Sequence, residues 1–260
     1  MNRDNIFWGA ALILLGVLFL LQNQGVIPSI LPFLWPLALI LFGSWLILSV
    51  YWKPKRSEVE NFIIPLEGAK SVNYKFMHGA GEIEIRGGAP MGTALVGTSA
   101  AGLNQSSRLN GERLEVRIEA GGSFVPFVGP SNGIWRFQLT PQVPVTLHVE
   151  TGASHLNMDL REVQAAHITL KTSASKTDVI LPARGASLLD LEAGTASINI
   201  RVPEGTAARI RFKEGLNSLN VDTNRFPPLD AEIYQSPDFD SAVNRAEINI
   251  QAGMASISIS

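Results

Sequence analysis

No charged residue occurs between Asp4 and Lys53. This uncharged stretch contains two apolar runs separated by a short polar turn at 22–25. A helix rises ~1.5 Å per residue, so about 20 apolar residues are needed to cross a bilayer core about 30 Å thick. The two runs reach this length if one helix spans Asn5 to Gln24 and the other spans Ile30 to Trp52. The sequence therefore predicts an N-terminal transmembrane α-hairpin.

The alternatives to a transmembrane hairpin are a signal peptide and a buried hairpin of a soluble protein. A signal peptide has a basic first segment and a cleavage site of small residues. Here Asp4 offsets Arg3, and no Ala-x-Ala motif follows Leu21. A soluble helix would carry a polar stripe, but residues 37–50 contain only Ser44, Ser49 and the Trp45 indole as polar groups. Both alternatives fit less well than two membrane spans.

The basic residues near the two spans predict their orientation. Arg3 precedes the first span, Lys53, Lys55 and Arg56 follow the second, and the connecting turn has no basic residue. Basic residues close to a span tend to remain in the cytoplasm. Both ends of the chain, and the domain that follows residue 56, are therefore expected on the cytoplasmic side of the membrane.

Composition excludes some classes of partner and site. The chain has a net charge of −2 and a pI near 6.1, and no basic face accumulates, so a nucleic-acid partner is not expected. Cysteine is absent, which excludes disulfides and thiolate metal sites.

Residues 57–260 form a second part in which apolar and polar residues alternate, as in half-buried strands. Within it a short pattern recurs: apolar-x-apolar, a corner of small residues, and apolar-x-apolar again. The copies with a regular spacing of ~21 residues, which is typical of stacked repeats, begin at Leu147, Ile168, Leu189 and Ile210. Further copies span Tyr74 to Ile85 and Ile248 to Ile259.

A strand pair of this size cannot bury its apolar face alone, whereas stacked copies can share one core. Small corner residues would let neighbouring copies approach closely. The pattern predicts an all-β repeat domain, either β-solenoid-like or an irregular two-layer β-sandwich, and a propeller is less favoured because its blades are longer. In the copy that begins at Leu189, the alternation points Ile198, Ile200 and Val202 inward, with Asn199 and Arg201 outward.

Two segments interrupt the repeats, at 120–145 and 224–244, and both are rich in aromatic residues, Gly and Pro. One interpretation is that they cap exposed edges of the stack. The other is that they bind a partner, because exposed aromatic side chains often anchor interfaces. The predicted partner contacts are Phe124, Phe127 and Trp135.

The histidines do not predict a metal site. The alternation points His148, His155 and His167 outward beside Glu150 and Asp159, but the spacing matches no HExxH-type motif. No metal and no cofactor is therefore expected.

Catalytic motifs are absent from the sequence as well. The glycines at 79–81 lack the third glycine and the helix of a dinucleotide fingerprint, so they indicate a repeat corner. No serine lies in a Gly-x-Ser-x-Gly elbow. The carboxylate pairs Glu82 and Glu84, and Asp190 and Glu192, lie at solvent-facing positions of strands. The chain is predicted not to be an enzyme.

Parts of the sequence resemble known families. The Asn23-Gln24-Gly25 turn and the Trp35-Pro36 entry to the second span look like the membrane region of LiaI/LiaF-like bacterial envelope-stress proteins. The pattern Gly-x-Ala-Ser-Ile-x-Ile, found from Gly194 and again from Gly253, is similar to toast-rack and adhesin-type β domains.

The resemblance implies a non-enzymatic, multi-pass protein of the bacterial inner membrane that senses or modulates envelope stress through protein–protein contacts. Its partners would be the lipid bilayer, a membrane sensor kinase or another envelope protein, and further copies of itself as a homo-oligomer. The best-known relatives have four spans, whereas two are predicted here. The alternative function is a surface-exposed adhesin-like domain anchored in the opposite orientation.

Overall fold

The computed structural model describes residues 59–100, 103–120, 134–213 and 218–260, together with positions 20, 24, 35, 36, 39, 42 and 43. The chain divides into two compact units, Met1–Arg56 and Ser57–Ser260. The predicted spans lie almost wholly outside the described residues, as do the four basic residues that predict their orientation. The described residues contain no helical segment that could span a bilayer.

The second unit is all-β, as predicted, and in its described part the strands form one mixed sheet. The strands are β1 (Val59–Pro65), β2 (Ser71–Gly87), β3 (Thr93–Ala100), β4 (Leu103–Asn110), β5 (Arg113–Ala120), β6 (Ile134–Leu139), β7 (Val145–Asp159), β8 (Ala165–Ile180), β9 (Ala186–Arg201), β10 (Ala207–Phe212), β11 (Ser218–Val221), β12 (Ile233–Gln235) and β13 (Arg245–Ile259). The main path through the sheet is β1-β3-β6-β2-β7-β8-β9-β13-β10-β12.

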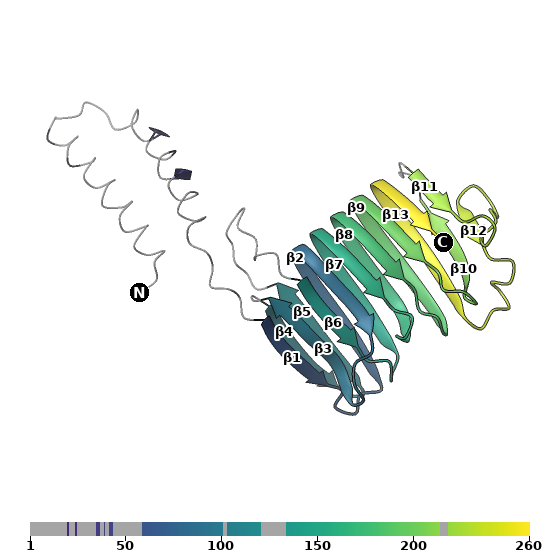
Figure 1. The fold of residues 1–260 in the computed structure, drawn as a ribbon, viewed down its shortest axis with the longest axis horizontal. Coiled ribbons are helices and arrows are strands. Elements are labelled where there is room, and N and C mark those ends of the chain that lie inside the picture. Colours follow the sequence, from purple (N-terminus) through teal and green to yellow (C-terminus); the bar gives the residue numbers. More distant parts are fainter. Residues whose placement is uncertain are drawn as a thin grey trace. The chain divides into compact units, whose positions relative to one another are not determined.

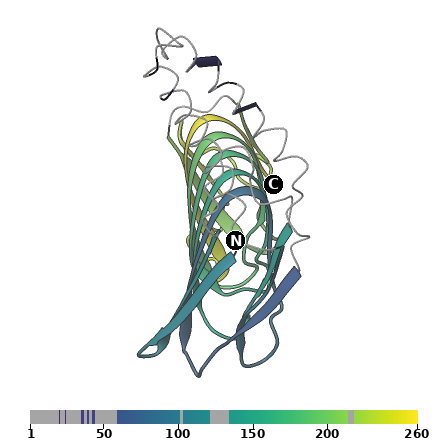
Figure 2. The same cartoon turned by 90° about the vertical axis from the view of Figure 1, so that its left-hand side faces the viewer.

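Five long strands give the domain its architecture. β2, β7, β8, β9 and β13 are 15–17 residues long and lie parallel to one another. Each bends near its middle, so that Figure 2 shows them as a series of nested arches. The two halves of each arch belong to two layers that face each other across the core, and Figure 1 shows the arches side by side.

The ~21-residue repeat predicted from the sequence matches the register of the arches. Leu147 pairs with Ile168, and Ile168 pairs with Leu189. The copies at Tyr74 and Ile248 join the same row, because Tyr74 pairs with Leu147 and Ile248 pairs with Leu189. Every copy thus contributes one aliphatic or aromatic side chain to the same level of the core.

The Ile210 copy does not follow the Leu189 copy in space, as it would in a stack built in sequence order. β13 lies between β9 and β10, so Ile210 pairs with Ile248 rather than with Leu189. β13 pairs with β9 over nearly its whole length, from Arg245 to Ile259. On its other side β13 pairs with β10 in its first half and with β11 in its second half, so the Ile210 copy lies beside the last repeat.

The alternation predicted along β9 is confirmed. Ile198, Ile200 and Val202 are each 1% exposed, whereas Asn199 and Arg201 lie on the solvent side. Side chains alternate between the faces of a strand, so the register of one residue determines that of its neighbours.

The segment at 224–244 covers the end of the stack, as the capping interpretation predicts. β12 pairs with the outer edge of β10, and Phe226 and Phe239 are buried. The Arg225 guanidinium donates hydrogen bonds to the carbonyl oxygens of Val202 and Pro203. A covered edge cannot recruit further strands by open backbone pairing.

In the segment at 120–145, residues 134–139 form β6, which pairs with β2 on one side and β3 on the other. Trp135 is 2% exposed and packs against Phe137, with the ring centroids 6.0 Å apart. The expectation that Trp135 is a surface contact for a partner is therefore wrong, because its indole is part of the core. Phe124 and Phe127 lie outside the described residues.

Candidate functional site

The bends of the five arches lie close together, and this proximity explains their small residues. A Cβ atom on Gly152 would lie 2.4 Å from the carbonyl oxygen of Gly79, and a Cβ atom on Gly194 would lie 2.6 Å from that of Ser173. Such separations are too short for non-bonded atoms, so these two positions require glycine. The expectation that small corner residues allow close approach of the copies is confirmed at both positions.

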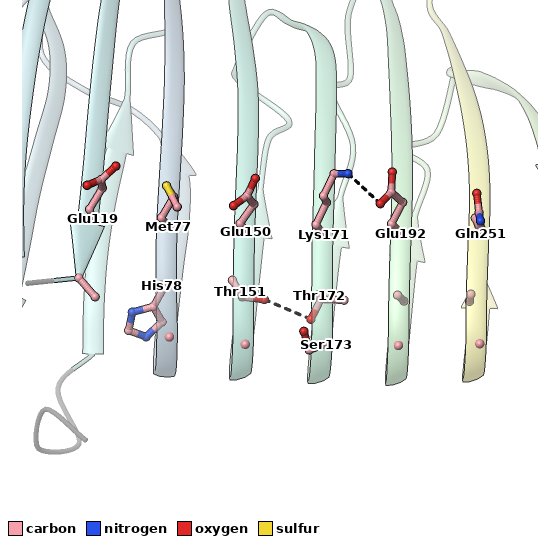
Figure 3. A pocket seen from close by; sticks show the side chains of 17 residues that line it. Met77, His78, Glu119, Glu150, Thr151, Lys171, Thr172, Ser173, Glu192 and Gln251 are labelled. Carbon is pink, nitrogen blue, oxygen red and sulfur yellow. Dashed lines mark hydrogen bonds and ion pairs between the residues drawn. The ribbon is translucent and has the colours of Figure 1, made fainter. Parts of the chain in front are cut away.

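A groove of about 1010 Å³, here called the corner groove, runs across the arches at these bends. Figure 3 shows its side chains in rows, one member from each strand. The outer row, in which four of the six residues are charged, consists of Glu119, Met77, Glu150, Lys171, Glu192 and Gln251. The row at the bends themselves consists of Gly79, Gly152, Ser173, Gly194 and Gly253. Because most of the second row has no side chain, backbone forms much of that part of the groove.

The carboxylates of the corner groove are paired with basic groups. The ammonium of Lys171 lies 2.8 Å from Glu192 Oε2, and Arg117 Nη1 lies 3.3 Å from Glu119 Oε1. His148 Nε2 lies 2.5 Å from Glu150 Oε1. This hydrogen bond lowers the pKa of Glu150 below its usual value, with a smaller effect from nearby lysines.

These pairings determine what the corner groove can do chemically. A catalytic general acid usually needs a carboxyl whose pKa is raised towards neutrality. Glu150 has the opposite shift, and Lys171, beside Glu192, has its pKa raised and stays charged. The groove therefore suits recognition of a ligand by charge and hydrogen bonds better than proton transfer.

His78 lies at the end of the corner groove and is 5% exposed. Its ring centroid is 4.3 Å from that of Trp135, and no residue that the structure describes forms a hydrogen bond with either ring nitrogen. Burial lowers the pKa of His78 from 6.5 to about 4. No sequence motif singles out His78, although Tyr74, Phe76 and His78 alternate along β2 and so share the inward face.

The other three histidines point outward, as predicted. His148 is paired with Glu150, His155 lies 3.6 Å from Asp178 Oδ2, and His167 lies 3.2 Å from Asp190 Oδ2. Asp159, which was expected beside these histidines, forms its ion pair with Arg161.

Within the described ranges, no three His, Cys, Asp or Glu side chains gather as metal ligands would. The carboxylates at 82, 84, 190 and 192 lie on the outer side of their strands, as expected. Glu84 pairs with Arg136, and Glu192 pairs with Lys171. Asp190 lies beside His167, and Glu82 is exposed.

The comparisons with known proteins agree with this architecture. Residues 53–201 match the family described as the N-terminal domain of toast_rack, and residues 6–47 match the LiaI-LiaF-like transmembrane region. The latter match implies that the protein is associated with a membrane. No curated protein matches the chain well enough to count as a relative.

Solved structures with a similar chain path include a proposed cell adhesion protein from Clostridium sporogenes ATCC 15579. Its TM-score is 0.69 at 18% sequence identity, and the match covers 78% of this chain and 98% of that one. At this identity the similarity concerns the fold alone. A proposed adhesin from Bacteroides fragilis NCTC 9343 gives a TM-score of 0.32 at 8% identity, covering 78% of this chain and 97% of that one, and supports no further argument.

The family match covers more than half of the chain and coincides with the arches β2, β7, β8 and β9. The chain is a membrane-associated member of the toast-rack family with a LiaI-LiaF-like transmembrane region.

Proposed function

We propose that this protein is a membrane-anchored regulatory or scaffold protein that modulates the bacterial response to envelope stress by binding other proteins. The observation that supports this most is that a LiaI-LiaF-like transmembrane region is followed directly by a toast-rack domain. In this proposal the protein spans the inner membrane twice, and its β domain lies in the cytoplasm. A membrane sensor kinase, another envelope protein or a second copy of the chain is the partner.

The corner groove is the proposed binding surface. It crosses five arches that are held in register by continuous backbone pairing, so its rows are rigidly spaced. Adjacent strands lie ~4.8 Å apart, which gives the groove a length of about 20 Å, enough for a short extended segment of a partner. Charged side chains line its outer row, and bare glycine backbone forms the bends.

Site-specific photo-crosslinking in living cells tests this function. A photoreactive amino acid would replace Glu192 or Gln251, which line the corner groove and are exposed. Ser197, exposed on the same domain but outside the groove, serves as the matched control. We expect one crosslinked protein at both groove positions and none at Ser197. Crosslinks of equal yield at all three positions, or none at any, would contradict the groove as the binding surface.

A second candidate function is that of a surface-exposed adhesin, because the first structural neighbour is a proposed cell adhesion protein. This function requires the β domain outside the cell, the reverse of the orientation that the basic residues favour. The side of the membrane on which the domain lies separates the two functions.

A further inference from the structure

His78 differs from the other histidines of the β domain in its partners. His148, His155 and His167 each lie within 3.6 Å of a carboxylate oxygen. Both ring nitrogens of His78 are buried, and neither has a hydrogen-bond partner among the described residues. Buried polar groups normally have a partner, so an orphaned imidazole calls for a physical explanation.

The contact between His78 and Trp135 connects the two layers of the first arch, which is formed by β2. His78 lies in β2 just before the bend, and Trp135 lies in β6 on the opposite layer. Their rings meet at a centroid distance of 4.3 Å with an interplanar angle of 48°. Trp135 in turn packs edge-on against Phe137 at 85°. The contact between His78 and Trp135 therefore helps to close this arch at its bend.

Charged groups near His78 point away from it. They are Lys75 and Glu82 on β2 itself, Glu119 on β5, Arg136 on β6, and Glu150 and His155 on β7. These residues occupy outward positions, the opposite face from His78. Figure 3 shows the Glu119 and Glu150 carboxylates in the row of Met77, one residue before the imidazole. Within the described part of the β domain, no carboxylate is thus placed to stabilise a protonated His78.

We propose that His78 and Trp135 form an acid-sensitive latch, in which protonation of His78 releases the bend of β2 from β6. A buried imidazolium without a partner is strongly disfavoured, whereas the same group in water is not. Attraction between the imidazolium and the indole face offsets part of this cost. Acid therefore favours an opened first arch in which the imidazole reaches water.

The sign and size of the effect follow from proton linkage. Burial lowers the pKa of His78 from 6.5 to about 4, so between these values the open form binds the proton and the closed form does not. The opening equilibrium is unaffected above pH 6.5 and rises as the pH falls below it. Between pH 7.5 and pH 5 the expected rise is about thirtyfold.

Hydrogen exchange of the full chain in detergent, read by mass spectrometry at pH 7.5 and pH 5, tests the latch. After correction for intrinsic exchange rates, peptides from the β2 bend and from β6 are expected to lose about thirtyfold in protection at pH 5, while β9 peptides stay better protected than these at both pH values, because β9 opens only when the whole domain unfolds. His78→Phe should abolish the loss, and His148→Gln, which alters a histidine already paired with a carboxylate, should retain it.

Two results would overturn the proposal. One is unchanged protection of the β2 bend at pH 5, and the other is the same loss in His78→Phe as in the native chain. If His78→Phe fails to give the native circular dichroism spectrum at pH 7.5, His78→Gln takes its place as the uncharged variant. Should neither variant fold, the native chain decides the outcome: protection of the β2 bend equal to that of β9 at pH 5 would mean that acid unfolds the whole domain, with no separate opening of the first arch.

Discussion

Gly152 and Gly79 lie so close at the bends of adjacent arches that a Cβ atom on Gly152 would come within 2.4 Å of the Gly79 carbonyl oxygen. The obstacle is backbone, which cannot rotate away as the end of a flexible side chain can. Adjacent arches therefore depend on the absence of a side chain at this position. The corner groove depends on the same feature, because the bare backbone of the bends lines it.

Gly152→Ala is expected to destabilise the β domain by about 1–3 kcal/mol, because the added methyl group forces the bends of β2 and β7 apart. The matched control is Gly253→Ala, where a Cβ atom would meet its nearest neighbour, the Gly194 carbonyl oxygen, at 3.4 Å. Denaturant unfolding followed by circular dichroism measures both variants. Equal stability of the two would mean that the bends are not in contact as described.

Ile200→Asp is expected to cost several kcal/mol, about 3 or more, because it places an unpaired carboxylate in the core. Ile200 is 1% exposed. Alternation alone suggests Asn199→Asp as a harmless control, but Asn199 donates a 2.7 Å hydrogen bond to Asp178, so that change would place two carboxylates together.

Ser197→Asp is the better control for Ile200→Asp, because Ser197 is exposed and its register neighbour on β8 is Lys176. We expect its free energy of unfolding to stay within about 0.5 kcal/mol of the native value, as for most surface changes. Thermal or denaturant unfolding would reveal the difference. If Ile200→Asp were as stable as Ser197→Asp, the inward register of β9 would be wrong.

The stability of the β domain should depend on pH through His78. Its folded-state pKa is lowered to about 4, below the 6.5 of the unfolded chain, so the unfolded state binds more protons between these values. Stability is thus unaffected above pH 6.5 and falls as the pH drops towards 4, by about 2 kcal/mol at pH 5. Urea unfolding at a series of pH values measures the slope, which His78→Phe should flatten between pH 6.5 and 5.

The orientation of the β domain can be measured in intact spheroplasts. If both termini are cytoplasmic, as the basic residues at 3, 53, 55 and 56 indicate, protease added outside should leave the β domain intact until the cells are lysed. A tag after Ser260 makes the domain visible on a blot. Digestion before lysis would contradict the regulatory function and favour the surface-exposed adhesin.

Much of the core could be predicted from sequence because strand alternation and the ~21-residue period are local and repeated. The inward positions of Ile198, Ile200 and Val202 follow from alternation alone. The glycine corners were recognised as places of close approach, since small residues recur there at the repeat spacing. The resemblance to toast-rack domains and to the LiaI/LiaF-like membrane region likewise rested on short motifs that the family matches support.

Other features required the tertiary structure. The place of β13 between β9 and β10 depends on pairing between segments far apart in sequence, and the period contains no information about that order. Trp135 looked like a surface aromatic among glycines and prolines, yet its indole is buried against His78 and Phe137. Alternation along β2 places His78 on the inward face, but it does not show that the imidazole is buried against Trp135, which lies in the second layer. Which face of each strand is apolar follows from the sequence, because that pattern is local. Which strands lie side by side depends on the folded chain, because backbone pairing is open to any strand of suitable length.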